Sequence, residues 1–157
     1  MGPEDSGDLY EAVVRHDSMM RWLATGRVGS RADALDMCRD HAAHWERHGY
    51  GDFAVRSIET NEFIGRVGLR IRPGFGVDLG FAIGPQAERQ GFASEAGQAC
   101  LDLAFGSLRL ATVFGFVLPD NERSVALLTR LGARPAGTIV SSGNHCLRFQ
   151  FDSPVSD

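Results

Sequence analysis

Residues 77–105, VDLGFAIGPQAERQGFASEAGQACLDLAF, form the stretch that decides the fold. Apolar side chains alternate with small or polar ones across residues 77–84, which is typical of a strand. From Phe92 onward the apolar side chains recur at helical spacing instead. A polar loop that ends in Gly91 separates the two patterns. The stretch therefore predicts a strand, a loop and a helix in direct succession.

The segments on both sides of this unit predict an α+β domain. Upstream, Ser30 is the expected N-cap of a helix that runs to about Arg47, with acidic Asp33 three positions after the cap. One or two helical turns are expected before it, from Leu9 to Trp22. We expect further strands at 52–58, 63–71, 111–119, 134–140 and 145–151, a turn at 141–144, and further helices at 92–108 and 122–131. This order predicts a central, mostly antiparallel mixed sheet flanked by helices, in which the strands before and after the helix at 92–108 are parallel.

Composition narrows the class of protein. The chain has 157 residues, of which 43% are apolar and 23% charged, as in an ordinary globular domain. The net charge of −4 argues against broad nucleic-acid binding and mildly favours a cationic substrate. No apolar run approaches the ~20 residues of a membrane span, and residues 1–8 do not resemble a signal peptide, so we expect a cytoplasmic protein. Residues 1–8 are predicted to be a flexible end, and 9–157 a single domain.

The cysteines and histidines do not predict a metal or disulfide site. The cysteine count is odd and contains no CxxC pair, and two of the three lie in predicted helices, where a buried apolar role is expected: Cys38, Cys100 and Cys146. Three histidines share one helical face at positions i, i+3 and i+7: His41, His44 and His48. Because no carboxylate or cysteine obviously completes this set, we favour a surface or a pocket rim over a metal site.

The loop before the helix at 92–108 has the parts of an anion cradle. The first backbone N–H groups of a helix are free and lie at its positive end. Gly91 and Ala93 leave the main chain accessible, Arg89 adds charge, and Gln90 and Ser94 add hydrogen-bond donors. The loop lacks the GK[ST] and GxGxxG patterns of nucleotide-binding loops. An ordinary strand-to-helix turn is the alternative, and the loop alone does not decide between them.

Two motifs together resemble a known family. The first joins Asp78-x-Gly80-Phe81 to Gly91-x-Ala93-Ser94-Glu95-Ala96, and the second joins Pro119-x-Asn121-x-x-Ser124 to Leu131-Gly132. In this order and spacing they resemble the GNAT superfamily of acyl-CoA-dependent N-acetyltransferases, and within it the RimJ/RimL branch of ribosomal-protein N-acetyltransferases. The likeness covers about Asp52 to Phe151.

The resemblance implies acetyl-CoA as the ligand of the loop. Backbone amides of the loop would hold the pyrophosphate, the strand before it would pair with the pantetheine arm, and one asparagine would hydrogen-bond that arm. The residues that the resemblance assigns to acetyl-CoA are Phe81, Ala82, Ile83, Arg89, Gln90, Gly91, Phe92, Ala93, Ser94 and Asn121. It implies no metal.

The resemblance also implies a mechanism, direct transfer of the acetyl group to a primary amine of a protein N-terminus or a small molecule. Asp78 is the candidate base, acting through water, and Ser124 the candidate group beside the thiol. The alternatives are a paired strand carboxylate for Asp78 and a helix-terminal hydrogen bond for Ser124. Leu128 stands where many relatives have a tyrosine that acts as a general acid. A homodimer is compatible with the fold.

Several features depart from the family pattern and keep rivals open. Glu88 is an acid close to the expected pyrophosphate, and the usual first strand is not visible unless residues 8–14 replace it. These departures allow a CoA-binding regulatory or interaction domain without catalytic activity. A different donor, such as succinyl-CoA, is a further alternative, because arginines near the expected cleft could pair with its carboxylate: Arg66, Arg70 and Arg72.

Overall fold

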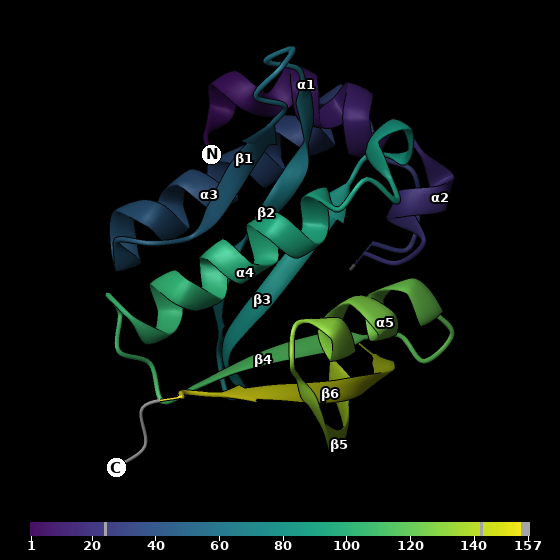
Figure 1. The fold of residues 1–157 in the computed structure, drawn as a ribbon. Helices are drawn as coiled ribbons and strands as arrows, with labels where there is room; N and C mark the ends of the chain where they lie inside the picture. The colour runs from purple at the N-terminus through teal and green to yellow at the C-terminus, as the bar shows by residue number, and fades with distance from the viewer. Residues whose placement is uncertain (24, 142, 155–157) are drawn as a thin grey trace.

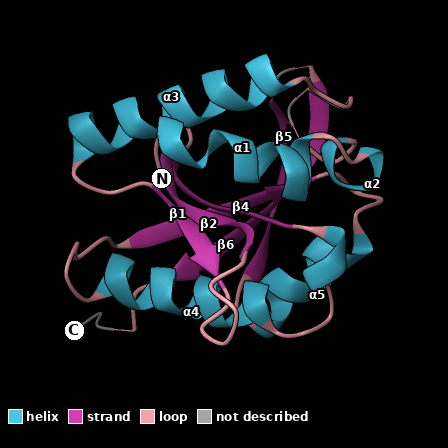
Figure 2. Ribbon diagram, turned by 90° about the horizontal axis from the view of Figure 1, so that it is seen from above, coloured by secondary structure: helices cyan, strands magenta, loops and turns pink. Residues whose placement is uncertain are grey.

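The computed structural model describes residues 1–23, 25–141 and 143–154. A six-stranded mixed sheet with the strand order β1-β2-β3-β4-β6-β5 lies between two layers of helices (Figures 1 and 2). The strands are β1 (Asp52–Arg56), β2 (Phe63–Arg72), β3 (Gly76–Ile83), β4 (Thr112–Val117), β5 (Arg134–Ser141) and β6 (Asn144–Asp152). One layer holds α1 (Ser6–Leu9), η2 (Tyr10–Val14), α2 (Asp17–Met20) and α3 (Arg31–His48), and the other holds α4 (Phe92–Phe105) and α5 (Glu122–Arg130). The α+β fold with a mixed sheet is confirmed.

The sheet opens between its two central strands, β3 and β4. β2 and β3 pair along their whole lengths in antiparallel register, from Gly65 opposite Ile83 to Arg72 opposite Gly76. β3 and β4 are parallel, as predicted, but pair only at Asp78 opposite Phe114. Beyond that point the two strands diverge (Figure 1). The second half of β3 therefore has no strand beside it on its β4 side.

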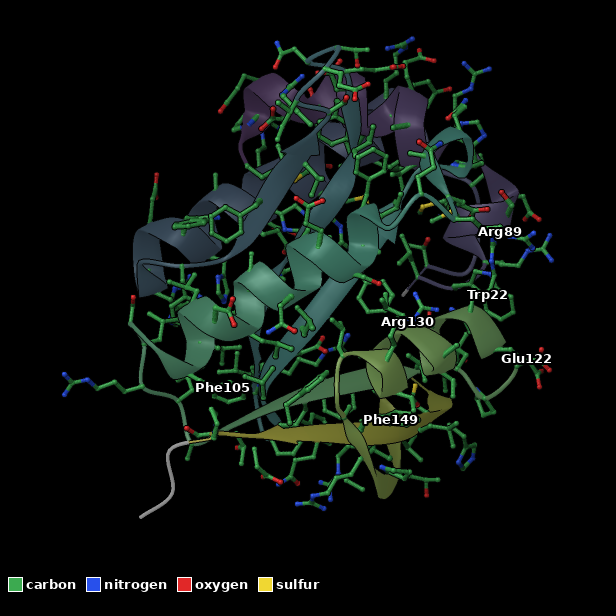
Figure 3. All side chains as sticks on the ribbon, viewed as in Figure 1. Trp22, Arg89, Phe105, Glu122, Arg130 and Phe149 are labelled. Atoms are coloured by element: carbon green, nitrogen blue, oxygen red, sulfur yellow. The ribbon has the colours of Figure 1, made fainter. Side chains whose placement is uncertain are left out.

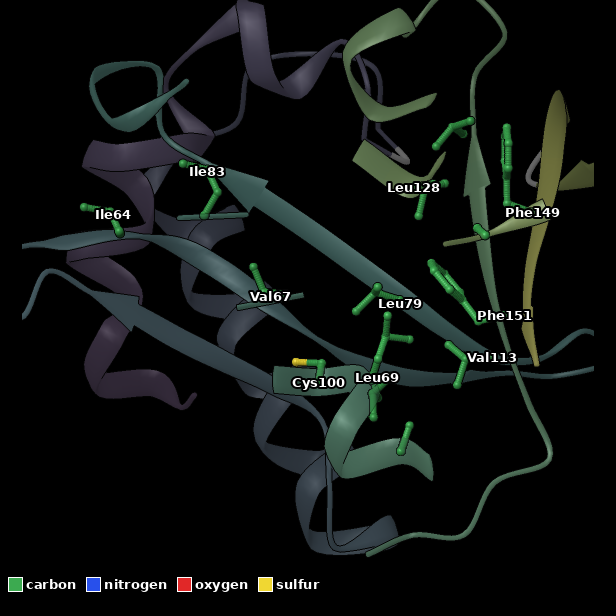
Figure 4. Close-up of a cluster of buried hydrophobic side chains, with 14 of the residues drawn as sticks. Ile64, Val67, Leu69, Leu79, Ile83, Cys100, Val113, Leu128, Phe149 and Phe151 are labelled. Carbon is green, nitrogen blue, oxygen red and sulfur yellow. The ribbon is translucent and has the colours of Figure 1, made fainter. Parts of the chain in front are cut away.

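Two apolar cores fill the space on the two faces of the sheet. The core beneath α4 and α5 includes Val67, Leu69, Leu79, Leu101 and Leu128, several of which Figure 4 shows converging from the strands and helices. The second core lies beneath α1, η2 and α3, and its buried residues are Leu9, Val13, Val14, Met20, Ala34, Cys38, Phe63 and Ala82. Burying one side chain of the size of leucine contributes about 1.5–3 kcal/mol. The two cores therefore fix both helix layers to the sheet.

Helix α3 is fixed at both ends by local contacts. Ser30 caps it, as predicted, by accepting a hydrogen bond from the Asp33 N–H, while the Ser30 N–H donates to the Asp33 carboxylate at 2.6 Å. Gly49 ends the helix with φ 74°, in the left-handed region. Trp45 Nε1 then donates to the main-chain oxygen of Asp52 at 2.8 Å. The helix therefore positions the first residue of β1.

The helical turns expected from Leu9 to Trp22 are present, and one alternative for this segment needs correction. Residues 8–14 do not form the strand that we considered for them, because Ser6–Leu9 and Tyr10–Val14 are helical, and no strand precedes β1 in the described residues. The first eight residues, expected to be a flexible end, include η1 (Pro3–Asp5) and the start of α1. Asp5 is buried there, accepts from the Gly2 N–H at 3.0 Å, and pairs with Arg56 at 3.2 Å. This pairing across 51 positions was invisible in the sequence pattern.

The predicted boundaries of the later elements agree with the structure to within about three residues. The turn expected between the last two strands includes residue 142, which lies outside the described residues. No helix in the described ranges is long and apolar enough to cross a membrane.

Candidate active site

A cavity of about 880 Å³ runs through the opening between β3 and β4. Its walls come from β2, β3, the start of α4, α5 and the segment after α2. Trp22 from that segment and Arg89 from the loop before α4 both line it (Figure 3). The cavity therefore brings together both motifs on which the family resemblance rests.

The predicted anion cradle lies at this cavity. Gly91 is the N-cap of α4 with φ 85°, and no side chain caps the helix. A Cβ at Gly91 would meet nothing within 4 Å, so the main chain there faces open space. Arg89 also has a positive φ of 61°, which is uncommon for a residue with a side chain. The free N–H groups of the first turn are therefore left available to an anion.

Charged side chains from α5 reach this loop. Glu88, the acid that departs from the family pattern, is paired with Arg123 through both oxygens, one of them at 2.9 Å. Arg130 donates to Ser94 Oγ at 3.2 Å, between α4 and α5 (Figure 3). Because Arg123 balances Glu88, Arg89 and Arg130 leave the loop with a positive charge. The pairing of Glu88 with Arg123, which links positions 35 residues apart, could not be predicted from the sequence.

The strand residues expected to hold the pantetheine arm line the cavity. Phe81, Ala82 and Ile83 are all in its wall, together with Phe92, Ala93 and Ser94 from α4. On the β2 side, Phe81 lies opposite Val67 and Ile83 opposite Gly65. On the other side β4 has already diverged, so the edge of β3 is open to an extended ligand. Gln90 is the one assigned residue that does not line the cavity among those described, and its side chain donates to the Gln86 carbonyl at 3.1 Å.

The second motif forms the N-terminus of α5. The Asn121 side chain caps this helix by accepting from the Ser124 N–H at 3.2 Å, and both residues line the cavity. The amide nitrogen of Asn121 is left to donate elsewhere. Within the described part of the chain the Ser124 hydroxyl makes no hydrogen bond, so its helix-terminal role belongs to its backbone and not to its side chain.

Leu128, in the position where many relatives have a tyrosine, is fully buried. It fills the space above Gly115 in β4, where a Cβ would come within 2.8 Å of the Leu128 side chain. This packing gives the position a role in the core.

Asp78 lies at the point where β3 and β4 separate. Its side chain lines the cavity, and its carboxylate accepts from Arg72 Nε at 2.6 Å. Burial raises the pKa of Asp78 above the usual carboxyl value, although the charge and hydrogen bond of Arg72 oppose this. Arg72 in turn donates to Ser141 Oγ at 3.2 Å and lies over the Phe116 ring. Asp78 is therefore a paired strand carboxylate that also faces the cavity, so both of the roles considered for it remain compatible with its position.

The three histidines of α3 have separate environments. The Ile71 N–H donates to His44 Nε2 at 3.0 Å, and His44 Nδ1 lies 2.9 Å from the Tyr50 oxygen, so His44 ties α3 to the sheet. Burial lowers the pKa of His44 and favours its neutral form. His48 packs beside His44 with ring centroids 4.6 Å apart. Only His41 lines the cavity, and no group of three or more metal-ligating side chains occurs in the described ranges.

Sequence reasoning missed a charged cluster around Asp52. This carboxylate is fully buried and contacts Arg66 Nη1 at 3.0 Å, His41 Nδ1 at 2.8 Å and Arg70 Nε at 3.7 Å. Burial by itself would raise the pKa of Asp52, but the charge of Arg66 and the contacts of His41 and Arg70 outweigh it and hold the pKa well below its usual range. Burial lowers the pKa of His41 in the same cluster. The alternation of polar and apolar residues along β2 was the only signal of this cluster in the sequence.

The cysteines agree with their predicted roles. Cys38 and Cys100 are buried in the two cores, and burial raises the pKa of each thiol to about 11. Cys146 is half-buried and lines the cavity, and burial also raises its thiol pKa. A raised pKa leaves these thiols protonated and weakly nucleophilic at neutral pH.

Comparison with known proteins identifies the family. The family described as Acetyltransferase (GNAT) domain matches residues 1–134. The chain is 26% identical over 138 residues to the uncharacterized N-acetyltransferase YoaA of Bacillus subtilis, which covers 87% of this chain and 78% of that protein. An acetyltransferase from Agrobacterium tumefaciens has a similar structure, with a TM-score of 0.80 and 25% identity over 96% of this chain and 86% of its own.

A second structural neighbour was solved with coenzyme A. It is RimL, a ribosomal L7/L12 alpha-N-protein acetyltransferase, and it superposes with a TM-score of 0.83 over 99% of this chain and 93% of its own. At 16% identity this superposition shows the shared fold alone. The family match covers most of the chain and includes α4, α5 and most of the residues that line the cavity. The chain therefore belongs to the GNAT family and is an acetyltransferase enzyme.

Proposed function

We propose that this enzyme transfers an acetyl group directly from acetyl-CoA to a primary amine in the cavity between β3 and β4. The observation that carries the proposal is the coincidence, in one cavity, of an uncapped positive helix end and an open strand edge. A pyrophosphate suits the first and an extended amide-bearing arm suits the second. The structure of RimL with coenzyme A, which shares this fold, supports the choice of ligand.

Under this proposal the loop residues bind the pyrophosphate and the strand orients the pantetheine arm. The main-chain N–H groups from Arg89 to Ser94 hold the pyrophosphate, with the Arg89 and Arg130 charges beside them. The main chain of Phe81–Ile83 pairs with the pantetheine amides, and the Asn121 amide nitrogen donates to the same arm. Acetyl-CoA supplies the acetyl group as a thioester.

The proposed chemistry needs a neutral amine that forms the C–N bond as the thioester C–S bond breaks, and the proton that the amine gives up is the one that the leaving thiolate takes. Asp78 removes the amine proton through water, and its raised pKa brings it closer to the pH at which a base works best. Arg72 positions the Asp78 carboxylate through its hydrogen bond, and its charge opposes the rise in the pKa of Asp78. The free Ser124 hydroxyl hydrogen-bonds the thiol and holds it in place, since a serine hydroxyl by itself is a weak acid.

The positions and the raised pKa values of the cysteine thiols support direct transfer. Of the described cysteines only Cys146 lines the cavity, and its raised pKa makes it a poor acyl carrier. The acceptor is a protein N-terminus or a small amine. We also propose a homodimer, since β1 is an edge strand of the sheet.

Release of free thiol from acetyl-CoA in the presence of an amine panel tests the proposal. We expect Asp78→Asn and Ser124→Ala to lower kcat at least roughly tenfold while the Kd for acetyl-CoA changes by less than about twofold. Ser107→Ala, an exposed serine after α4, is the matched control. Tight acetyl-CoA binding without amine-dependent thiol release would favour the regulatory or interaction domain instead. Sedimentation of the same samples tests the homodimer.

A further inference from the structure

The cluster around Asp52 faces the cavity with an unbalanced charge. Arg66 and Arg70 lie on the same face of β2, both line the cavity, and both contact the one Asp52 carboxylate. Two guanidinium groups thus share a single negative charge, since the lowered pKa of His41 leaves that imidazole neutral. One positive charge at this place is therefore uncompensated.

Arg70 carries most of this surplus. Its Nε lies 3.7 Å from Asp52, beyond hydrogen-bond distance, and 38% of its side chain is exposed. Arg66, by contrast, is held at 3.0 Å, and only 13% of its side chain is exposed. Arg70 lies opposite Asp78 in the sheet, but Asp78 is already paired with Arg72. Arg70 is therefore a fixed cation with hydrogen-bond donors that still face the cavity.

Two glycines lie beside these arginines, and one of them, Gly80, lines the cavity. Gly68 lies between Arg66 and Arg70 on β2, opposite Gly80 on β3. A Cβ at Gly68 would come within 2.3 Å of the Asp52 Cα, so no larger residue fits there. A Cβ at Gly80 would stand 3.6 Å from Arg66 Nη1, in ordinary contact. Gly80 therefore adds no side-chain atoms to the cavity floor, and the guanidinium of Arg66 lies beside it.

The other acidic side chains near Arg66 and Arg70 do not cancel this surplus positive charge. Asp78 is neutralised by Arg72, and Asp52 is counted already. Asp40 on α3 also lines the cavity, but it is exposed, so water and salt screen its charge. The local charge of this part of the cavity is thus opposite in sign to the net charge of the chain.

We propose that Arg70 and Arg66, held by Asp52 above Gly80, form a carboxylate-binding subsite of the transferase. The geometry suits a carboxylate because two guanidinium groups supply several N–H donors in fixed planes. This inference rests on the proposed acetyl-transfer function and names the substrate class of the same site. The carboxylate belongs either to the acceptor amine or to the acyl chain of the donor, and both place it beside β3.

Matched amines separate these sources. Thiol release from acetyl-CoA is measured with 4-aminobutyrate against butylamine, phenylalanine against phenylethylamine, and lysine against cadaverine. A carboxylate on the acceptor predicts kcat/KM roughly tenfold or more higher for at least one acidic member of a pair. A carboxylate on the donor predicts that succinyl-CoA exceeds acetyl-CoA by a similar factor with the neutral amines.

Two variants test the residues. Arg70→Met should remove the preference while the Kd for acetyl-CoA changes by less than about twofold. Gly80→Ala, which fills the floor without changing any charge, should reduce the preference as well. Arg39→Met, an exposed arginine of α3 paired with Asp36, is the control and should leave the preference intact. Arg66 is not the first choice, because its loss would leave Asp52 buried without its main partner.

Direct binding keeps this test separate from the test of acetyl transfer. Calorimetric titration of 4-aminobutyrate and of butylamine, with and without coenzyme A, reports on the subsite even if acetyl-CoA fails to bind. The subsite would be overturned if neither the acidic amines nor succinyl-CoA were preferred over their neutral counterparts, or if the preference survived Arg70→Met. Failure of acetyl-CoA itself to bind would overturn the proposed function.

Discussion

Replacing Asp52 with asparagine should destabilise the protein strongly and in a pH-dependent way. The variant keeps the shape of the side chain but removes the buried charge that contacts Arg66, His41 and Arg70. Removing one partner of a buried ion pair typically costs about 3–5 kcal/mol, because the other charge is left uncompensated. For a chain of this size that corresponds to a fall in Tm of roughly 6–20 °C.

The pH dependence follows from the direction of the pKa shift. The pKa of Asp52 is lowered in the folded protein, so its stabilising contribution is complete above the unfolded value of about 3.9 and is lost as the pH falls toward the folded value. Between pH 6 and pH 3 the wild type should lose about 1.3 kcal/mol through this group alone. The asparagine variant has no such group to titrate, so the stability gap should narrow by that amount.

Urea unfolding of both proteins at pH 6 and pH 3 measures the gap. Carboxylates away from this cluster titrate equally in the two proteins and cancel in the difference. Asp36→Asn is the control, since Asp36 is exposed and pairs only with Arg39 at 3.1 Å, and it should cost less than about 1 kcal/mol. A cost for Asp52→Asn as small as this control, or a gap that does not change with pH, would refute the charge-based account of the cluster.

Three further predictions concern the loop and the core. Gly91→Ala should lower the free energy of unfolding by about 1–2 kcal/mol, because its φ of 85° strains any side chain although the space around it is open; chemical denaturation measures this, and an unchanged midpoint would contradict it. Arg123→Gln should weaken acetyl-CoA binding by up to roughly fivefold by unpairing Glu88, and adding Glu88→Gln should restore it in a calorimetric titration. If the double variant binds as weakly as the single one, repulsion from Glu88 is not the cause. Leu128→Ala should cost about 2–5 kcal/mol in thermal or urea unfolding, whereas a loss below about 1 kcal/mol would exclude the core role.

The sequence was sufficient for what depends on local pattern. The change from alternating to helical spacing around Gly91 predicted β3, the loop and α4, because each period belongs to one kind of element. The Ser30 cap with Asp33 was likewise readable, since both partners lie within one turn. The candidates Asp78 and Ser124 came from the resemblance to the GNAT superfamily, and both residues line one cavity.

What the sequence did not provide depends on contacts between distant positions. Glu88 looked unfavourable because its partner, Arg123, lies on another helix. Asp52 looked like an ordinary strand residue because its partners come from α3 and β2. The N-terminal segment looked flexible because the pairing of Asp5 with the distant Arg56 was not visible.

Calorimetric titration with acetyl-CoA and desulfo-CoA tests the central claim most directly. We expect one saturable site per chain in the micromolar range for both ligands, weakened by Arg130→Gln because that residue adds positive charge beside Ser94. No binding to a folded sample of the wild type would contradict the account, because the open edge of β3 and the uncapped end of α4 would then hold some other ligand.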